Sequence, residues 1–320
     1  MTSLFDVTDN DDILALQPRL TDDDPGVRRI ALIELADLEE PDGLQWLINR
    51  LAEDPIAEVR AEAARLLEAW EDSPVVEALC QALTDPSSAV QAAAAQSLSL
   101  LKSEAAGRVI LPWTGHADSC VRIAAFRALR ELRCPDAAAA AARALIDESA
   151  SVRREAVGVL GWLKQLDALP ALARLASADP DTEVRRAATG ALGLASDAQV
   201  LPALRQALRD AAWQVREEAA TTLGKVGHPD AGPALIDALD DDYWQVRLRA
   251  TRSLGRLRFV PALDALIDTL SHRISNLRKE AALALGELND PGAIAALQAA
   301  QDDGDPEVRK AVRIALSQLQ

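Results

Sequence analysis

Apolar residues recur along this chain in a repeated pattern. A Val-Arg pair returns every 31 or 32 residues, with Val90-Gln91 and Leu277-Arg278 as variants, and Ala stands four residues after the Val in every copy but the last, which has Val312. Spacings of four and eight residues place side chains on one face of an α-helix, so each copy is predicted to contain an amphipathic helix, called helix B, with this face buried. The residue eight positions after the Val is Leu in all ten copies: Leu35, Leu67, Leu98, Leu129, Leu160, Leu192, Leu223, Leu254, Leu285 and Leu316.

The remainder of each copy predicts a second amphipathic helix and a short acidic turn. In the segment PDAGPALIDALDDDYWQ, Asp230 is expected to cap that helix and Pro233 to lie in its first turn. Two helices of about 12 residues and two tight turns fill each copy. A single helix pair cannot bury its apolar face, whereas stacked pairs share one core, so the pattern predicts an all-α fold, an α-solenoid (superhelix) of about ten helix pairs.

Glycine follows the Leu in five consecutive copies. These residues are predicted to let neighbouring helices approach closely, and they are not expected to form a phosphate-binding loop, because they fall inside predicted helices. They are Gly161, Gly193, Gly224, Gly255 and Gly286.

Copies such as VREEAATTLGKVGHPDAGPALIDALDD resemble HEAT repeats, and specifically the short HEAT-like repeats of the phycocyanobilin (PBS) lyase family. The resemblance covers residues 13–320 as a single solenoid and leaves residues 1–12 as an acidic N-terminal tail. It implies the solenoid fold. The family includes bilin lyase subunits, assembly and maturation helpers, and interaction scaffolds, so the fold does not choose among these functions.

Composition narrows the function classes. The 320 residues carry a formal net charge of −16, which disfavours an ordinary nucleic-acid binder. The amino terminus lacks the features of a secretory signal, and no uninterrupted apolar stretch approaches the ~18 residues of a membrane span, so a soluble, cytoplasmic protein with no membrane partner is expected. Cys80, Cys120 and Cys134 form no CxxC pair and indicate neither a disulfide framework nor a zinc site.

The repeated arginine of the Val-Arg pairs offers two interpretations. It could form a phosphate-binding track, or it could bond to an acidic residue of the repeat, and the family resemblance implies the second. Aspartates lie five residues before the Val of their own copies at Asp54, Asp85, Asp179, Asp210 and Asp241. We therefore expect this arginine ladder to be structural.

The sequence predicts no catalytic residue, no metal and no cofactor. Metal-dependent hydroxylases built from such repeats use His-Glu dipeptides, and none of the histidines, His116, His228 and His272, is followed by Glu. His116 and Cys120 are spaced as a possible ligand pair, but no two further ligands accompany them. Enzymatic activity is therefore uncertain, and the balance is against it.

The predicted partner-binding site lies on the concave face of helix B. Trp213 and Trp244 stand two residues before the Val in consecutive copies, and Trp162 stands ten residues after it in the fifth copy. The expected concave columns of the fourth to ninth copies hold eight basic and seven acidic side chains, but those of the eighth copy hold no acid. Its arginines form one stripe at i, i+3 and i+7: Arg249, Arg252 and Arg256.

Exposed Trp beside Arg is typical of a binding hot spot. The alternative is that the Trp rings fold over the turns and the Arg side chains only solvate a helix face.

Three functions follow from these features. The favoured one is a non-catalytic protein-interaction scaffold, or an assembly or maturation helper, that binds a client protein in its concave groove. The second is a bilin lyase or isomerase subunit, in which the Arg stripe pairs with tetrapyrrole propionates, the Trp rings stack on the chromophore, and Cys120 is the one weak candidate for chemistry. The third, a helical-repeat protein that binds or repairs DNA, requires a basic groove and is disfavoured.

Overall fold

The computed structural model describes residues 8–195 and 198–319, in which it places twenty α-helices and no strand. The chain divides into two compact units, one that ends at Leu163 and one that begins at Lys164, and each is described by itself.

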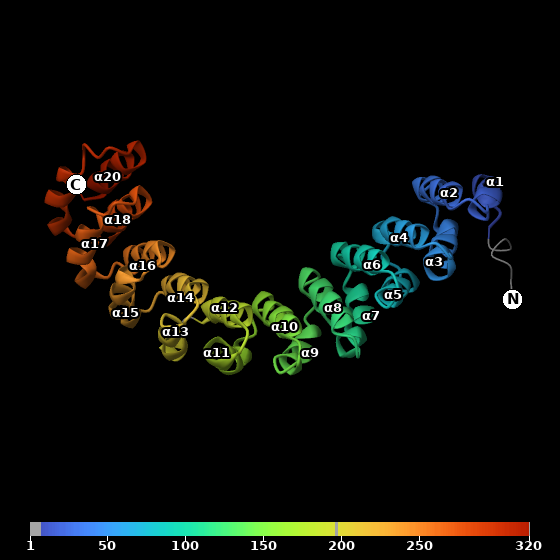
Figure 1. The fold of residues 1–320 in the computed structure, drawn as a ribbon, viewed down its shortest axis with the longest axis horizontal. Helices are drawn as coiled ribbons and strands as arrows, with labels where there is room; N and C mark the ends of the chain where they lie inside the picture. Colours follow the sequence, from blue (N-terminus) through green and yellow to red (C-terminus); the bar gives the residue numbers. More distant parts are fainter. Residues whose placement is uncertain (1–7, 196–197, 320) are drawn as a thin grey trace. The chain divides into compact units, whose positions relative to one another are not determined.

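Five helix pairs make up the first unit (Figure 1). The helices are α1 (Asp11–Leu20), α2 (Pro25–Asp37), α3 (Leu44–Glu53), α4 (Ala57–Leu66), α5 (Ser73–Ala82), α6 (Ser88–Leu100), α7 (Glu104–Ile110), α8 (Ser119–Glu131), α9 (Ala137–Ala144) and α10 (Ala150–Trp162). Short 3₁₀ turns extend some of them: η2 (Pro41–Gly43), η3 (Leu67–Ala69) and η4 (Leu111–Gly115).

The second unit contains the other five pairs. The helices are α11 (Leu169–Ala178), α12 (Thr182–Ala191), α13 (Leu201–Ala207), α14 (Trp213–Val226), α15 (Gly232–Asp237), α16 (Trp244–Arg256), α17 (Leu263–Thr269), α18 (Ser275–Leu288), α19 (Ile294–Ala299) and α20 (Pro306–Gln318). Its 3₁₀ turns are η5 (Leu166–Ala168), η6 (Leu192–Leu194), η7 (Ala198–Val200), η8 (Pro229–Ala231), η9 (Ala238–Asp240), η10 (Val260–Ala262) and η11 (Pro291–Ala293).

The even-numbered helices are the predicted B helices, and within each unit they pack side by side. In the first unit α2 contacts α4, α4 contacts α6, α6 contacts α8 and α8 contacts α10. In the second unit the same order runs from α12 through α14, α16 and α18 to α20. The odd-numbered helices form the other layer of each stack (Figure 1). These ten pairs confirm the all-α solenoid that the repeat predicted.

The predicted apolar columns form the core. Every residue of the Ala column, including Val312, is buried. Nine of the ten Leu residues are buried as well, and Leu316 of α20 is half-buried. Leu316 lies in α20, the last helix of the stack. Within the chain only one neighbouring B helix, α18, packs against α20, which leaves Leu316 partly exposed.

Two local predictions are wrong. The odd-numbered helices contain six to ten residues instead of about 12. In the eighth copy, 3₁₀ turns η8 and η9 flank α15 and take up the rest of the segment. Asp230 is not a cap, because the His228 side chain precedes η8 and accepts a hydrogen bond from the Asp230 N–H at 3.2 Å. Pro233 lies in the first turn of α15, as predicted.

Close helix approach is confirmed at the later glycines. A Cβ on Gly255 would lie 2.7 Å from the Ala284 Cα atom of α18, and one on Gly286 would lie 2.8 Å from the Ala315 Cα atom of α20. A Cβ on Gly193 would meet Thr222 Cγ2 at 3.4 Å and Lys225 Cδ at 3.6 Å, which are ordinary contacts. Close approach at Gly161 stays a prediction.

The first helix starts inside the predicted tail. Residues 1–7 lie outside the described residues, but α1 already begins at Asp11. Asn10 caps it, since its Oδ1 atom accepts from the Asp12 and Ile13 N–H groups. Among the described helices, none combines the length and the apolar character that crossing a membrane would require.

Candidate functional site

Aromatic side chains gather where α14 and α16 begin. Trp213 is the first residue of α14 and Trp244 the first of α16, and the two helices pack against each other. The extended backbone of Tyr243, the residue before α16, sets its ring against Trp213, with centroids 5.5 Å apart and ring planes 12° apart. Tyr243 is 45% exposed and Trp244 is 36% exposed. We call Trp213, Tyr243 and Trp244 the aromatic cluster.

The two tryptophans differ in their surroundings. Trp213 is half-buried and covers the turn before α16, which is the arrangement that the alternative interpretation described. Trp244 keeps an exposed surface. Sequence reasoning missed Tyr243, although its position next to Trp244 in an acidic turn was a visible signal.

Two of the three arginines in the α16 stripe form ion pairs with glutamates, contrary to the sequence-based expectation that the stripe is uncompensated. Arg249 donates from Nε to Glu217 of α14 at 3.0 Å. Arg252 donates from Nε and an η-nitrogen to both carboxylate oxygens of Glu280 of α18, at 2.6 and 2.8 Å. The acids come from the neighbouring B helices, so a search of the eighth copy alone could not find them.

These ion pairs join Arg249 and Arg252 to the neighbouring helices α14 and α18. The bonds to Glu280 raise the pKa of Arg252 further above its ordinary value, so its charge is fixed. Arg256, the last residue of α16, is exposed and makes no ion pair with the described residues.

Trp162 lies in the first unit, as the last residue of α10, and is described separately from the aromatic cluster. Its ring is 54% exposed. The Arg133 guanidinium carbon lies 5.0 Å from the ring centroid, within the range of a cation–π contact.

The arginine ladder is structural, as predicted. In each of six pairs, the Arg of one copy donates from Nε and an η-nitrogen to both carboxylate oxygens of an Asp in the next copy, at 2.6–3.0 Å. We call each pair a rung. The six are Arg28–Asp54, Arg60–Asp85, Arg122–Asp147, Arg185–Asp210, Arg216–Asp241 and Arg278–Asp303.

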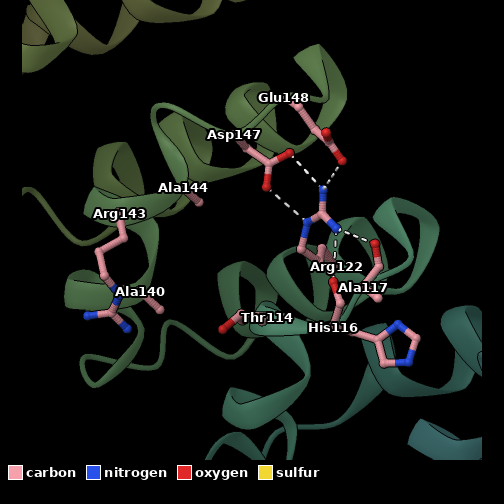
Figure 2. Close-up of a pocket in the computed structure, with 10 residues that line it drawn as sticks. Thr114, His116, Ala117, Arg122, Ala140, Arg143, Ala144, Asp147 and Glu148 are labelled. Carbon is pink, nitrogen blue, oxygen red and sulfur yellow. Dashed lines mark hydrogen bonds and ion pairs between the residues drawn. The ribbon is translucent and has the colours of Figure 1, made fainter.

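Each rung also joins the arginine to the turn before its own helix. Figure 2 shows this for Arg122, whose remaining η-nitrogen donates to the His116 and Ala117 carbonyl oxygens while Asp147 holds the other edge. Glu148 lies 3.8 Å from the same guanidinium. The rung borders an open pocket of about 560 Å³, where Arg122 is already neutralised by Asp147.

The ligand pair suggested by spacing does not form a metal site. His116 precedes α8 and its Nδ1 atom accepts a hydrogen bond from the Asp118 N–H at 3.0 Å, while its ring stacks on Trp113. Cys120 is exposed in the first turn of α8. Within residues 8–195 and 198–319, no group of three or more His, Cys, Asp or Glu side chains could hold a metal ion.

Comparison with protein families identifies the repeat. The model for HEAT repeats matches residues 8–68, 44–119, 107–192, 175–254 and 232–317. A search of curated proteins finds no match.

Several solved structures share this fold. An engineered protein is 23% identical, with 96% of this chain and 98% of that chain covered and a TM-score of 0.54. YibA of Escherichia coli is 22% identical, with 80% and 94% covered and a TM-score of 0.61. Yeast importin-β, Kap95p, in a structure with RanGDP, is 15% identical with a TM-score of 0.69. There 96% of this chain matches 49% of Kap95p, so the chain spans about half of that protein.

Proposed function

Because this chain belongs to the HEAT-repeat family, we propose that it is a non-catalytic scaffold that binds a client protein and assists its assembly or maturation. The observation that carries the proposal is the aromatic cluster, in which Tyr243 and Trp244 are exposed at the start of α16 and the Tyr243 ring stacks on Trp213 at the start of α14. Large exposed aromatic side chains are enriched at binding hot spots. Stacked repeats offer an extended, preorganised surface for such a contact. Kap95p, which has a similar fold, binds RanGDP.

The proposed contact surface is the side of the stack formed by the even-numbered helices, which the sequence predicts to be concave. Trp213 and Trp244 supply apolar area there. Arg249 and Arg252 are held in place by Glu217 and Glu280, so they act as oriented hydrogen-bond donors with little net charge. Arg256 belongs to the same surface of the second unit, and Trp162 of the first unit is proposed as a separate client contact.

The test is capture of client proteins from the native cell, with the wild type beside a Trp213→Ala, Trp244→Ala double variant. Any captured protein is then purified and its affinity measured by calorimetry. The double variant should lose about 2 kcal/mol or more of binding free energy, as hot-spot truncations do. Ile146→Ala is the matched control, because Ile146 is 89% exposed and lies in the other unit. Equal affinity of the double variant and the control would contradict the proposal.

A tetrapyrrole-binding role is the second possibility from the sequence, and the ion pairs make it weaker. Propionate groups need available cations, and both Arg249 and Arg252 already bond to carboxylates. A coloured chromophore that copurifies with the protein would support the tetrapyrrole-binding role. Assignment to the phycocyanobilin lyase type of repeat, and a cytoplasmic location, stay predictions. The assignment to that type of repeat rests on the copies of about 31 residues.

A further inference from the structure

One rung of the arginine ladder lacks its acid. In the six bonded rungs the Asp lies 25 or 26 residues after the Arg. Arg247 of α16 corresponds to those arginines, but the residue 25 positions after it is His272. The Arg247 side chain makes no hydrogen bond or ion pair with the described residues, and its Nε atom is buried without a partner.

The other position at which a histidine replaces the rung aspartate has no such imbalance. His116 occupies the Asp position for the third copy, but there the arginine is replaced by Gln91. The Gln91 side-chain amide donates to the Asp85 carbonyl oxygen at 2.8 Å, as the arginines do to their own turns. That rung carries no surplus charge, whereas the Arg247 rung retains a full positive charge.

The surroundings of Arg247 do not supply the missing anion. Burial lowers the pKa of His272, and the charges of Arg247, Arg273 and Arg278 lower it further, so the imidazole is neutral near pH 7. Its Nδ1 atom accepts from the Ile274 N–H at 3.0 Å. Asp241 lies close enough to feel the charge of Arg247, but both of its carboxylate oxygens bond to Arg216, at 2.6 and 3.0 Å.

We propose that the guanidinium of the half-buried Arg247 residue binds a carboxylate group of an Asp or Glu side chain of the client, in the role that Asp plays in the other rungs. This inference rests on the proposed scaffold function and names the chemistry of its partner. An unpaired guanidinium gains strongly from a two-point bond to a carboxylate. Tyr243 and Trp244 lie about one turn before Arg247, at the start of α16, so an apolar side chain next to that acid would contact them.

The first experiment uses a small probe and the whole chain. N-acetyl-aspartate amide is titrated while the arginine Nε–H signals are followed by NMR, and Arg247→Gln assigns the signal. We expect a saturable shift of the Arg247 signal in the wild type and none for Arg216, whose Nε bonds to Asp241. N-acetyl-asparagine amide, which lacks the charge, should cause no shift. An unmoved Arg247 signal would overturn the site.

His272→Asp provides the decisive variant. It places a carboxylate at the position that holds Asp in the six bonded rungs, so it should complete the rung, raise the resistance to urea and abolish the probe response. The variant should be at least as stable as the wild type, so a loss of binding cannot come from unfolding. The same probe response in His272→Asp as in the wild type would show that the carboxylate binds elsewhere.

Measuring client affinity shows whether Arg247 binds a carboxylate of the client protein or that of a small molecule. Arg247→Gln and His272→Asp should each weaken client binding roughly ten- to hundredfold, the range of a hydrogen bond to a charged group. A probe response at Arg247 with unchanged client affinity would overturn the assignment to the client and indicate a small carboxylate. If instead the probe fails while the aromatic variants still weaken client binding, the scaffold function stands and this site does not.

Discussion

Leu223 shows at the scale of one residue how the repeat stabilises the fold. Its side chain is completely buried in α14, which packs between α12 and α16. We expect Leu223→Ala to lower the free energy of unfolding by about 2–5 kcal/mol, because the surrounding stack cannot collapse fully into the cavity. Urea unfolding followed by circular dichroism measures this. Leu316→Ala is the control and should cost less, because Leu316 is half-buried, and equal losses would contradict the packing argument.

At Gly255 the close approach of α16 and α18 leaves no room for a side chain. In an exposed helix, Gly→Ala gains about 1 kcal/mol of stability. At Gly255 the new Cβ would lie 2.7 Å from the Ala284 backbone, so α16 and α18 would have to separate and Gly255→Ala should destabilise the protein. Gly190→Ala is the control, because its Cβ would meet the mobile carboxylate end of Glu218. Thermal unfolding should rank Gly255→Ala below the wild type and Gly190→Ala at or above it.

At the scale of the element, each rung joins two helix pairs. The hydrogen bond from Arg60 holds the pKa of Asp85 below its ordinary value, even though burial acts in the opposite direction. A carboxyl group whose folded-state pKa is lowered stabilises the fold above its unfolded-state pKa, and that contribution disappears as the pH falls through the folded-state pKa. The contribution of this rung should therefore be complete above about pH 5, and it should decrease progressively as the pH falls below about 4.

Asp85→Asn tests that contribution, because the amide oxygen can still accept from the Ser87 N–H. We expect the variant to lose about 1.5–3 kcal/mol near pH 7, the range for a hydrogen bond to a charged group. The difference from the wild type should shrink as the pH falls below about 4. Asp72→Asn is the control, since Asp72 is exposed and makes no ion pair with the described residues. A difference that is constant across pH would rule out the rung as its source.

The sequence predicts the helix pairs well because their signal is local. The Ala and Leu columns recur within one helix, and spacing alone assigns them to the core. The ion pairs of the α16 surface depend on contacts between helices: Glu217 lies 32 residues before Arg249, and Glu280 lies 28 residues after Arg252. Such partners require the register of neighbouring copies. His272 stands where other copies have the rung aspartate, and this is visible in the sequence. That it leaves Arg247 without an acid follows only from the contacts between successive copies.

Charge is the property that matters at the scale of the whole molecule. The chain has 50 acidic and 34 basic side chains, and at least six of the arginines are held in rungs. Two more, Arg249 and Arg252, bond to glutamates. A phosphate backbone would therefore have to compete with carboxylates for these arginines, which reduces the counterion release that drives DNA binding. Binding one client carboxylate at Arg247 requires no such competition.

We therefore expect duplex DNA to bind weakly and without sequence preference. The net charge of −16 repels the polyanion, and carboxylates already hold the six rung arginines and Arg249 and Arg252, which phosphates would otherwise bind. Electrophoretic titration at near-physiological salt should give a dissociation constant no tighter than about 10⁻⁶ M, as for non-specific complexes. Asp85→Asn and Asp210→Asn, which free Arg60 and Arg185 from their rungs, should tighten it slightly. A constant at or below about 10⁻⁸ M for the wild type would mean that the rungs open to admit phosphate, and the structural interpretation of the ladder would then be wrong.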